Sequence, residues 1–93
     1  MLQQIEELLR AEEPTLARME DTLTEGYAQA LALEAERWRL ERRIGEFARN
    51  GRTDLDELRR LGSRLTRADG ELERLRTLLG SLHERTRTVR RAS

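Results

Sequence analysis

Apolar residues recur at heptad spacing along most of the chain, in two stretches separated by Asn50-Gly51-Arg52-Thr53. This spacing places one apolar stripe along each of two long helices. The first stripe contains Leu16, Met19, Leu23, Ala30, Leu33, Leu40, Ile44 and Phe47, and the second contains Leu58, Leu61, Leu65, Ala68, Leu72, Leu75, Leu79, Leu82 and Val89. When the chain is folded at the turn, the two stripes meet in layers whose residue numbers add to 105. The pattern predicts an all-α fold, an antiparallel two-helix coiled-coil hairpin.

Residues that end or begin helices give the expected helix boundaries within a single domain over residues 1–93. Pro14 either starts the first long helix or kinks a longer one, and both readings are open. Gly51, after Asn50, suits the left-handed conformation that ends a helix, and Thr53 suits the cap of the next one. We therefore expect an N-terminal helical segment over 1–13, a first helix over 14–49, a turn over 50–53, a second helix over 54–90 and a tail over 91–93.

Small residues face large ones in several layers of this register. Gly26 is paired with Leu79, and Arg37, the one charged residue in the first stripe between residues 16 and 47, is paired with Ala68. Such pairing fixes the register, because a slip of one heptad would set large residues against each other. Two readings of Arg37 stay open. It is a register-setting polar layer, or it reaches outward with Arg39, Arg42 and Arg43 to meet an acidic partner.

Charge is balanced overall but divided between the two arms. Residues 1–50 contain 11 acidic residues and 7 arginines, and residues 51–93 contain 7 acidic residues and 11 arginines, which favours pairing of the arms with each other. The register brings Glu20 near His83. It also brings Glu34 near Asp69, an unfavourable pair unless Arg76 or Arg37 intervenes.

Four apolar residues before Pro14 have no partner in this pairing scheme: Leu2, Ile5, Leu8 and Leu9. Burying one such side chain is worth about 1.5–3 kcal/mol, so these residues provide a substantial driving force for contact. The segment either folds back across the open end of its own hairpin or packs on another chain. We favour the second reading and expect a partner or oligomer interface here.

A second apolar stripe lies outside the heptad seam of the first long helix. We call Ala28, Leu31, Ala35 and Trp38 the outer stripe. A two-helix hairpin cannot cover this face, and domains of this size commonly gain stability by association. We expect Leu31 and Trp38 to contact a partner or a second subunit, with a homodimeric four-helix bundle as the assembly. The alternative is that the Trp38 ring lies against arginine side chains such as Arg42.

Composition argues against several other functions. There is no cysteine, His83 is the single histidine, and no glycine-rich phosphate loop is present, so we expect no enzyme activity, no cofactor and no metal site. The longest apolar run is Ala30–Leu33, and the first residues do not resemble a secretion signal. We therefore expect a cytoplasmic protein that does not enter a membrane.

One charged cluster suggests an alternative function. Four arginines lie near the C-terminal end, Arg85, Arg87, Arg90 and Arg91, and could contact nucleic acid or another anionic partner. Acidic residues at the same end oppose this, and no aromatic residue is interleaved for base stacking. The leading hypothesis is a non-enzymatic protein–protein interaction module, a coiled-coil adaptor, chaperone or regulator. The runner-up is a small regulator that binds an anionic partner.

Overall fold

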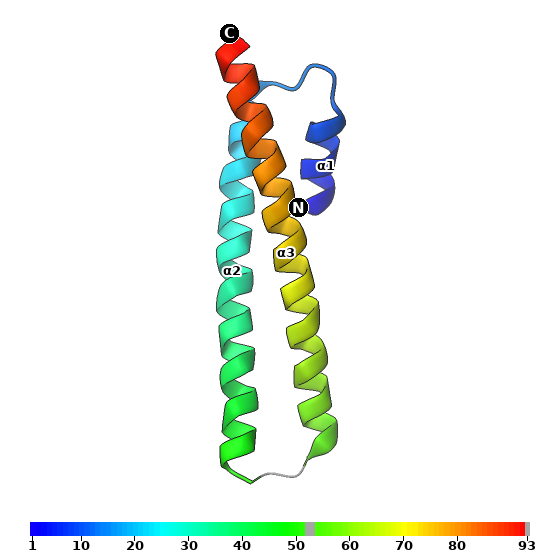
Figure 1. Cartoon of the computed structure of the whole chain (residues 1–93), viewed down its shortest axis with the longest axis vertical. Coiled ribbons are helices and arrows are strands. Elements are labelled where there is room, and N and C mark those ends of the chain that lie inside the picture. Colours follow the sequence, from blue (N-terminus) through cyan, green and yellow to red (C-terminus); the bar gives the residue numbers. More distant parts are fainter. Residues whose placement is uncertain (52–53, 93) are drawn as a thin grey trace.

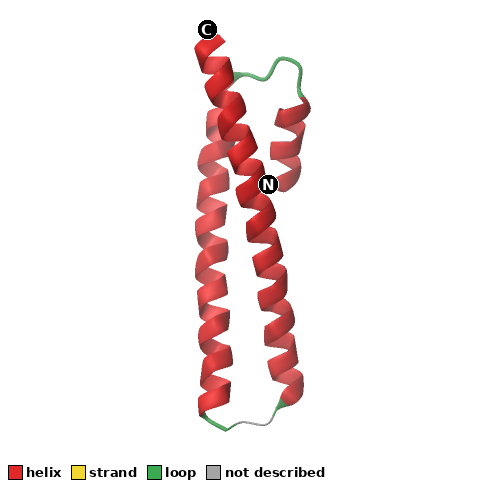
Figure 2. Cartoon of the chain, in the orientation of Figure 1, coloured by secondary structure: helices red, strands yellow, loops and turns green. Residues whose placement is uncertain are grey.

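The computed structural model describes residues 1–51 and 54–92, and this part of the chain is all-helical, as the periodicity predicts. It contains three helices and no strand: α1 (Leu2–Arg10), α2 (Leu16–Arg49) and α3 (Leu55–Ala92) (Figure 2). The two long helices lie side by side and run in opposite directions, and α1 lies along the C-terminal half of α3 (Figure 1). The molecule is elongated, with extents of 60 × 17 × 14 Å.

The helix ends follow from local sequence. The chain leaves α1 at Ala11, whose backbone is extended, and passes Pro14 before α2 begins at Leu16. Gly51 has a φ of 63°, the left-handed conformation expected of the residue after the α2 end. The Asp54 carboxylate accepts a hydrogen bond from the Glu57 backbone N–H at 3.2 Å, so Asp54 caps the start of α3. The predicted Thr53 cap lies outside the described residues.

Most residues of the two apolar stripes lie between α2 and α3. Met19, Leu40, Leu61, Leu72 and Leu75 are among those that are fully or almost fully buried. The exception is Leu58, which is exposed near the turn. The largest connected core lies at the other end of the molecule, where α1 adds a third helix. The most extensive core therefore lies where the three helices meet.

The register is visible at the layer of Gly26 and Leu79. Gly26 is buried, and a Cβ atom placed on it would collide with the buried Leu79 side chain. Any side chain at position 26 would therefore force the buried Leu79 to shift. In contrast, a Cβ atom at Gly70 would meet nothing within 4 Å.

These two glycines give a matched pair of substitutions. Gly70→Ala is expected to raise the free energy of unfolding by about 1 kcal/mol, because alanine is the better helix former. Gly26→Ala is expected to lower it by about 1–3 kcal/mol, because the gain in helix propensity is outweighed by overpacking against Leu79. Urea unfolding followed by circular dichroism at 222 nm measures both. Equal effects of the two substitutions would contradict the predicted register contact.

Ion pairs across the α2–α3 seam resolve the predicted conflict between Glu34 and Asp69. Arg76 pairs with Glu34, and the Nε of Arg37 lies 2.9 Å from Oδ1 of Asp69. Arg37 also contacts Glu41 on its own helix at 3.2 Å. Because the Arg37 guanidinium joins α2 to α3, these contacts support its interpretation as a register-setting residue.

Candidate interaction surface

Helix α1 folds back onto its own chain, which is the alternative that we did not favour from the sequence. Ile5 is 0% exposed and Leu8 is 5% exposed, and both belong to the main core cluster. Leu2 and Leu9 are partly buried against the same cluster, as is Leu78 of α3. In this conformation Ile5 and Leu8 are not available to another chain.

Two polar contacts hold α1 in place on α3. The Glu6 carboxylate and the Arg74 guanidinium are 2.6 Å apart. At the other end of α1, Arg85 donates hydrogen bonds to the Leu9 carbonyl at 2.7 Å and to the Ala11 carbonyl. The last carbonyls of a helix have no partner within it and carry partial negative charge, so the cation caps α1.

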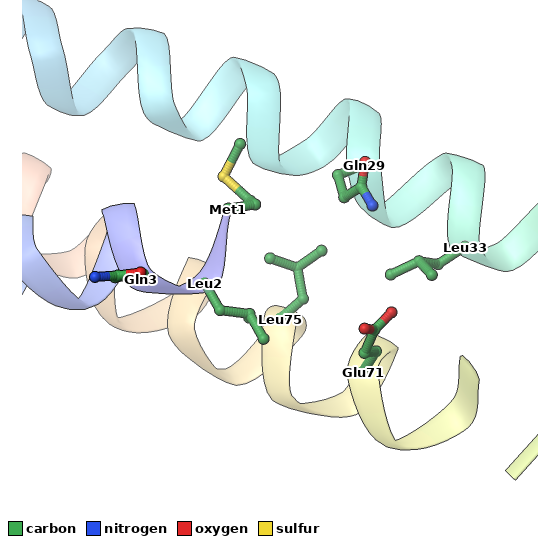
Figure 3. Close-up of a pocket in the computed structure, with 7 residues that line it drawn as sticks. All are labelled: Met1, Leu2, Gln3, Gln29, Leu33, Glu71 and Leu75. Carbon is green, nitrogen blue, oxygen red and sulfur yellow. The ribbon is translucent and has the colours of Figure 1, made fainter. Parts of the chain in front are cut away.

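At the N-terminal end of α1, where its coverage of α2 and α3 stops, a hollow of about 250 Å³ lies between α2 and α3. Figure 3 shows Met1 and Leu2 on one side of Leu75 of α3, with Leu33 of α2 on the other side, and all four residues line the hollow. Glu71 of α3, which is exposed, also lines the hollow. The hollow marks the end of the three-helix part of the molecule.

The outer stripe is the most exposed apolar surface of α2. Leu31 is 66% exposed and Trp38 is 58% exposed, and Ala28 and Ala35 are exposed beside them. The Arg42 guanidinium carbon lies 5.1 Å from the centre of the Trp38 ring, a cation–π contact that agrees with the alternative interpretation of Trp38. This contact still leaves more than half of the Trp38 surface open to solvent.

An apolar groove borders the outer stripe on a face of α3 different from the one that holds α1. The groove has a volume of about 420 Å³, and Leu31 and Tyr27 of α2 line it together with Leu79 and Gly80 of α3. The sequence interpretation did not include Tyr27, which is 48% exposed. The signal was available, since Tyr27 lies one helical turn before Leu31 on the same side of the helix.

The four C-terminal arginines do not form one free cluster. Arg85 caps α1, Arg90 pairs with Glu20, and Arg87 lies 3.3 Å from Glu84. Arg91 is exposed in the last turn of α3. Glu20 therefore pairs with Arg90 and not with His83, the neighbour expected from the sequence. His83 is exposed, and it lines one shallow hollow together with Glu20 and Arg90.

Two further features, a metal-binding group of side chains and a membrane-spanning helix, are absent from residues 1–51 and 54–92. No group of three or more histidine, cysteine, aspartate and glutamate side chains is arranged to hold a metal ion. No helix in this part of the chain combines the length and apolar character needed to cross a bilayer. Comparisons with protein-family models, curated proteins and solved structures find no match to this chain.

Proposed function

We propose that this protein is a non-enzymatic protein–protein interaction module whose binding surface is the outer stripe together with the neighbouring Tyr27. The observation that carries the proposal is the exposure of Leu31 and Trp38, 66% and 58%, on a face of α2 that neither α1 nor α3 covers. The proposed partner is an amphipathic helix, since the small side chains of Ala28 and Ala35 allow a helix to approach closely.

Self-association through this face is the simplest form of the proposal. Two copies joined through their α2 helices would bring four long helices together, with the two α3 helices on the outside. The contact is one helix face, smaller than the interfaces of about 1,200–2,000 Å² that hold stable complexes. We therefore propose weak association that depends on concentration.

A matched pair of leucines tests the proposal. Leu31→Glu is expected to weaken association at least about tenfold, because it places a charge where about 1.5–3 kcal/mol of apolar burial is otherwise gained. Leu55 is equally exposed, at 67%, but lies near the turn, so Leu55→Glu is expected to leave association unchanged. Glutamate forms helices well, and both variants should remain folded. Sedimentation equilibrium over a range of concentrations measures the effect.

Trp38 provides a second measurement on the wild-type protein. Its emission is expected to shift to shorter wavelength as concentration rises, because association removes the indole from water. A wild-type protein that stays monomeric, with a red emission maximum at every concentration, would contradict self-association. Binding to DNA or RNA that weakens with salt would instead favour the alternative function.

A further inference from the structure

We propose that a second copy of this chain binds to the outer stripe with the two α2 helices antiparallel, in the register that sets Leu31 against Ala35 and Trp38 against Ala28. The inference rests on the proposed function and specifies the partner, its direction and its register. It starts from two features of α2: the order of large and small residues in the outer stripe, and the distribution of charge along the helix.

The outer stripe is complementary to itself in one direction. Its residues in chain order are small, large, small and large: Ala28, Leu31, Ala35 and Trp38. When a second α2 runs in the opposite direction about a two-fold axis between Leu31 and Ala35, each large side chain faces an alanine of the other copy. Such an axis makes both halves of the interface identical, so the contact of Leu31 with Ala35 and the contact of Trp38 with Ala28 each occur twice.

The charges of α2 favour the same direction. Residues 16–30 and 36–49 contain four charged residues that pair with α3 and are set aside: Glu20, Glu36, Arg37 and Arg43. Of the others, residues 16–30 contain Asp21 and Glu25 with Arg18, whereas residues 36–49 contain Arg39, Arg42 and Arg49 with Glu41 and Glu46. Antiparallel pairing lays the acidic half of each α2 on the basic half of the other, while parallel pairing would lay like charge on like. Charge therefore selects the direction, and the large and small residues select the register.

One pair of residues reports on this arrangement directly. In the proposed register Glu25 of one copy lies beside Arg39 of the other, and the two-fold axis repeats the pair. Both side chains are exposed. Within one chain they are 14 positions apart on the same helix, about 21 Å, so they cannot pair with each other. Any coupling between them must come from a second copy.

A charge exchange at these positions tests the proposal. Glu25→Arg and Arg39→Glu, each alone, create two repulsive pairs per dimer and are expected to raise the dissociation constant about tenfold. An equimolar mixture of the two variants restores both attractive pairs. The mixture should therefore associate as tightly as the wild-type protein, within about twofold. The chain that carries both substitutions should recover in the same way. Sedimentation equilibrium at low ionic strength measures all four samples.

Control variants place the same charge changes on α3. Glu73→Arg and Arg67→Glu, both at exposed positions, should leave association unchanged, alone or mixed. If single variants weaken association but the mixture does not recover, the proposed register is wrong. If Leu31→Glu disrupts association and the charge exchange has no effect, the antiparallel arrangement fails while the proposed function stands. A wild-type chain that stays monomeric overturns both the second copy proposed here and self-association as the function.

Discussion

Ile5→Ala is expected to lower the free energy of unfolding by about 2–5 kcal/mol, although Ile5 belongs to a helix of only nine residues. Ile5 is 0% exposed and lies in the same cluster as Met19 of α2 and Leu82 of α3. Removing three carbons there leaves a cavity where the three helices meet. The loss is therefore comparable to that of a residue in the long helices.

The size of the effect has an upper limit set by the docking of α1. A nine-residue helix is not stable alone in water, so α1 unfolds once it leaves α3. If Ile5→Ala costs more than the whole free energy with which α1 docks, α1 detaches. The stability of the α2–α3 pair then falls by no more than that docking free energy. The urea midpoint then reports only the docking free energy, and faster hydrogen exchange of the α1 amides reports the detachment.

Gln4→Ala is the matched control, since Gln4 is exposed in the same helix. It should change the free energy of unfolding by less than about 0.5 kcal/mol. If Ile5→Ala were as mild as Gln4→Ala, α1 would not be packed as described. In that case the four apolar residues of α1 would again be candidates for contact with another chain.

The seam between α2 and α3 could be predicted from the sequence because one apolar stripe per helix keeps the same heptad frame throughout, with only Gly26, Arg37 and Thr86 breaking its apolar character. The layer of Gly26 and Leu79, and the ion pairs of Glu34 and Asp69 with neighbouring arginines, follow from that register. These features depend only on which residues of two helices face each other. A period of seven specifies the faces of the two helices, and the pairing of small with large residues specifies the register.

The position of α1 could not be predicted in the same way, because the pairing rule considers only two helices. The overlooked signal is Leu78, which lies outside the seam but between Leu75 and Leu82, and widens the apolar surface of α3 toward a second side. A wider stripe is typical of a helix with two neighbours. Nothing in the periodicity, however, says whether that neighbour comes from the same chain.

Arg85 illustrates a second limit of sequence interpretation. An arginine in a run of arginines suggests an anionic ligand, but the carbonyl groups that Arg85 binds belong to the backbone and leave no mark in the sequence. Arg85→Ala is expected to lower the free energy of unfolding by about 2–3 kcal/mol, because it removes two charge-assisted hydrogen bonds to the end of α1. The urea midpoint and hydrogen exchange of α1 measure this loss.

Two further variants separate the capping role of Arg85 from a general effect of charge. Arg85→Lys keeps the charge but replaces the planar fork with a single ammonium group, so it should recover only about half of the loss. Arg91→Ala removes an exposed arginine from the last turn of α3 and should cost less than about 0.5 kcal/mol. If Arg85→Ala and Arg91→Ala had equal effects, Arg85 would not cap α1. Arg85 would then be free to contact an anionic partner. A large loss in the free energy of unfolding of Arg85→Ala, measured without any added anion, shows instead that the guanidinium stabilises the fold.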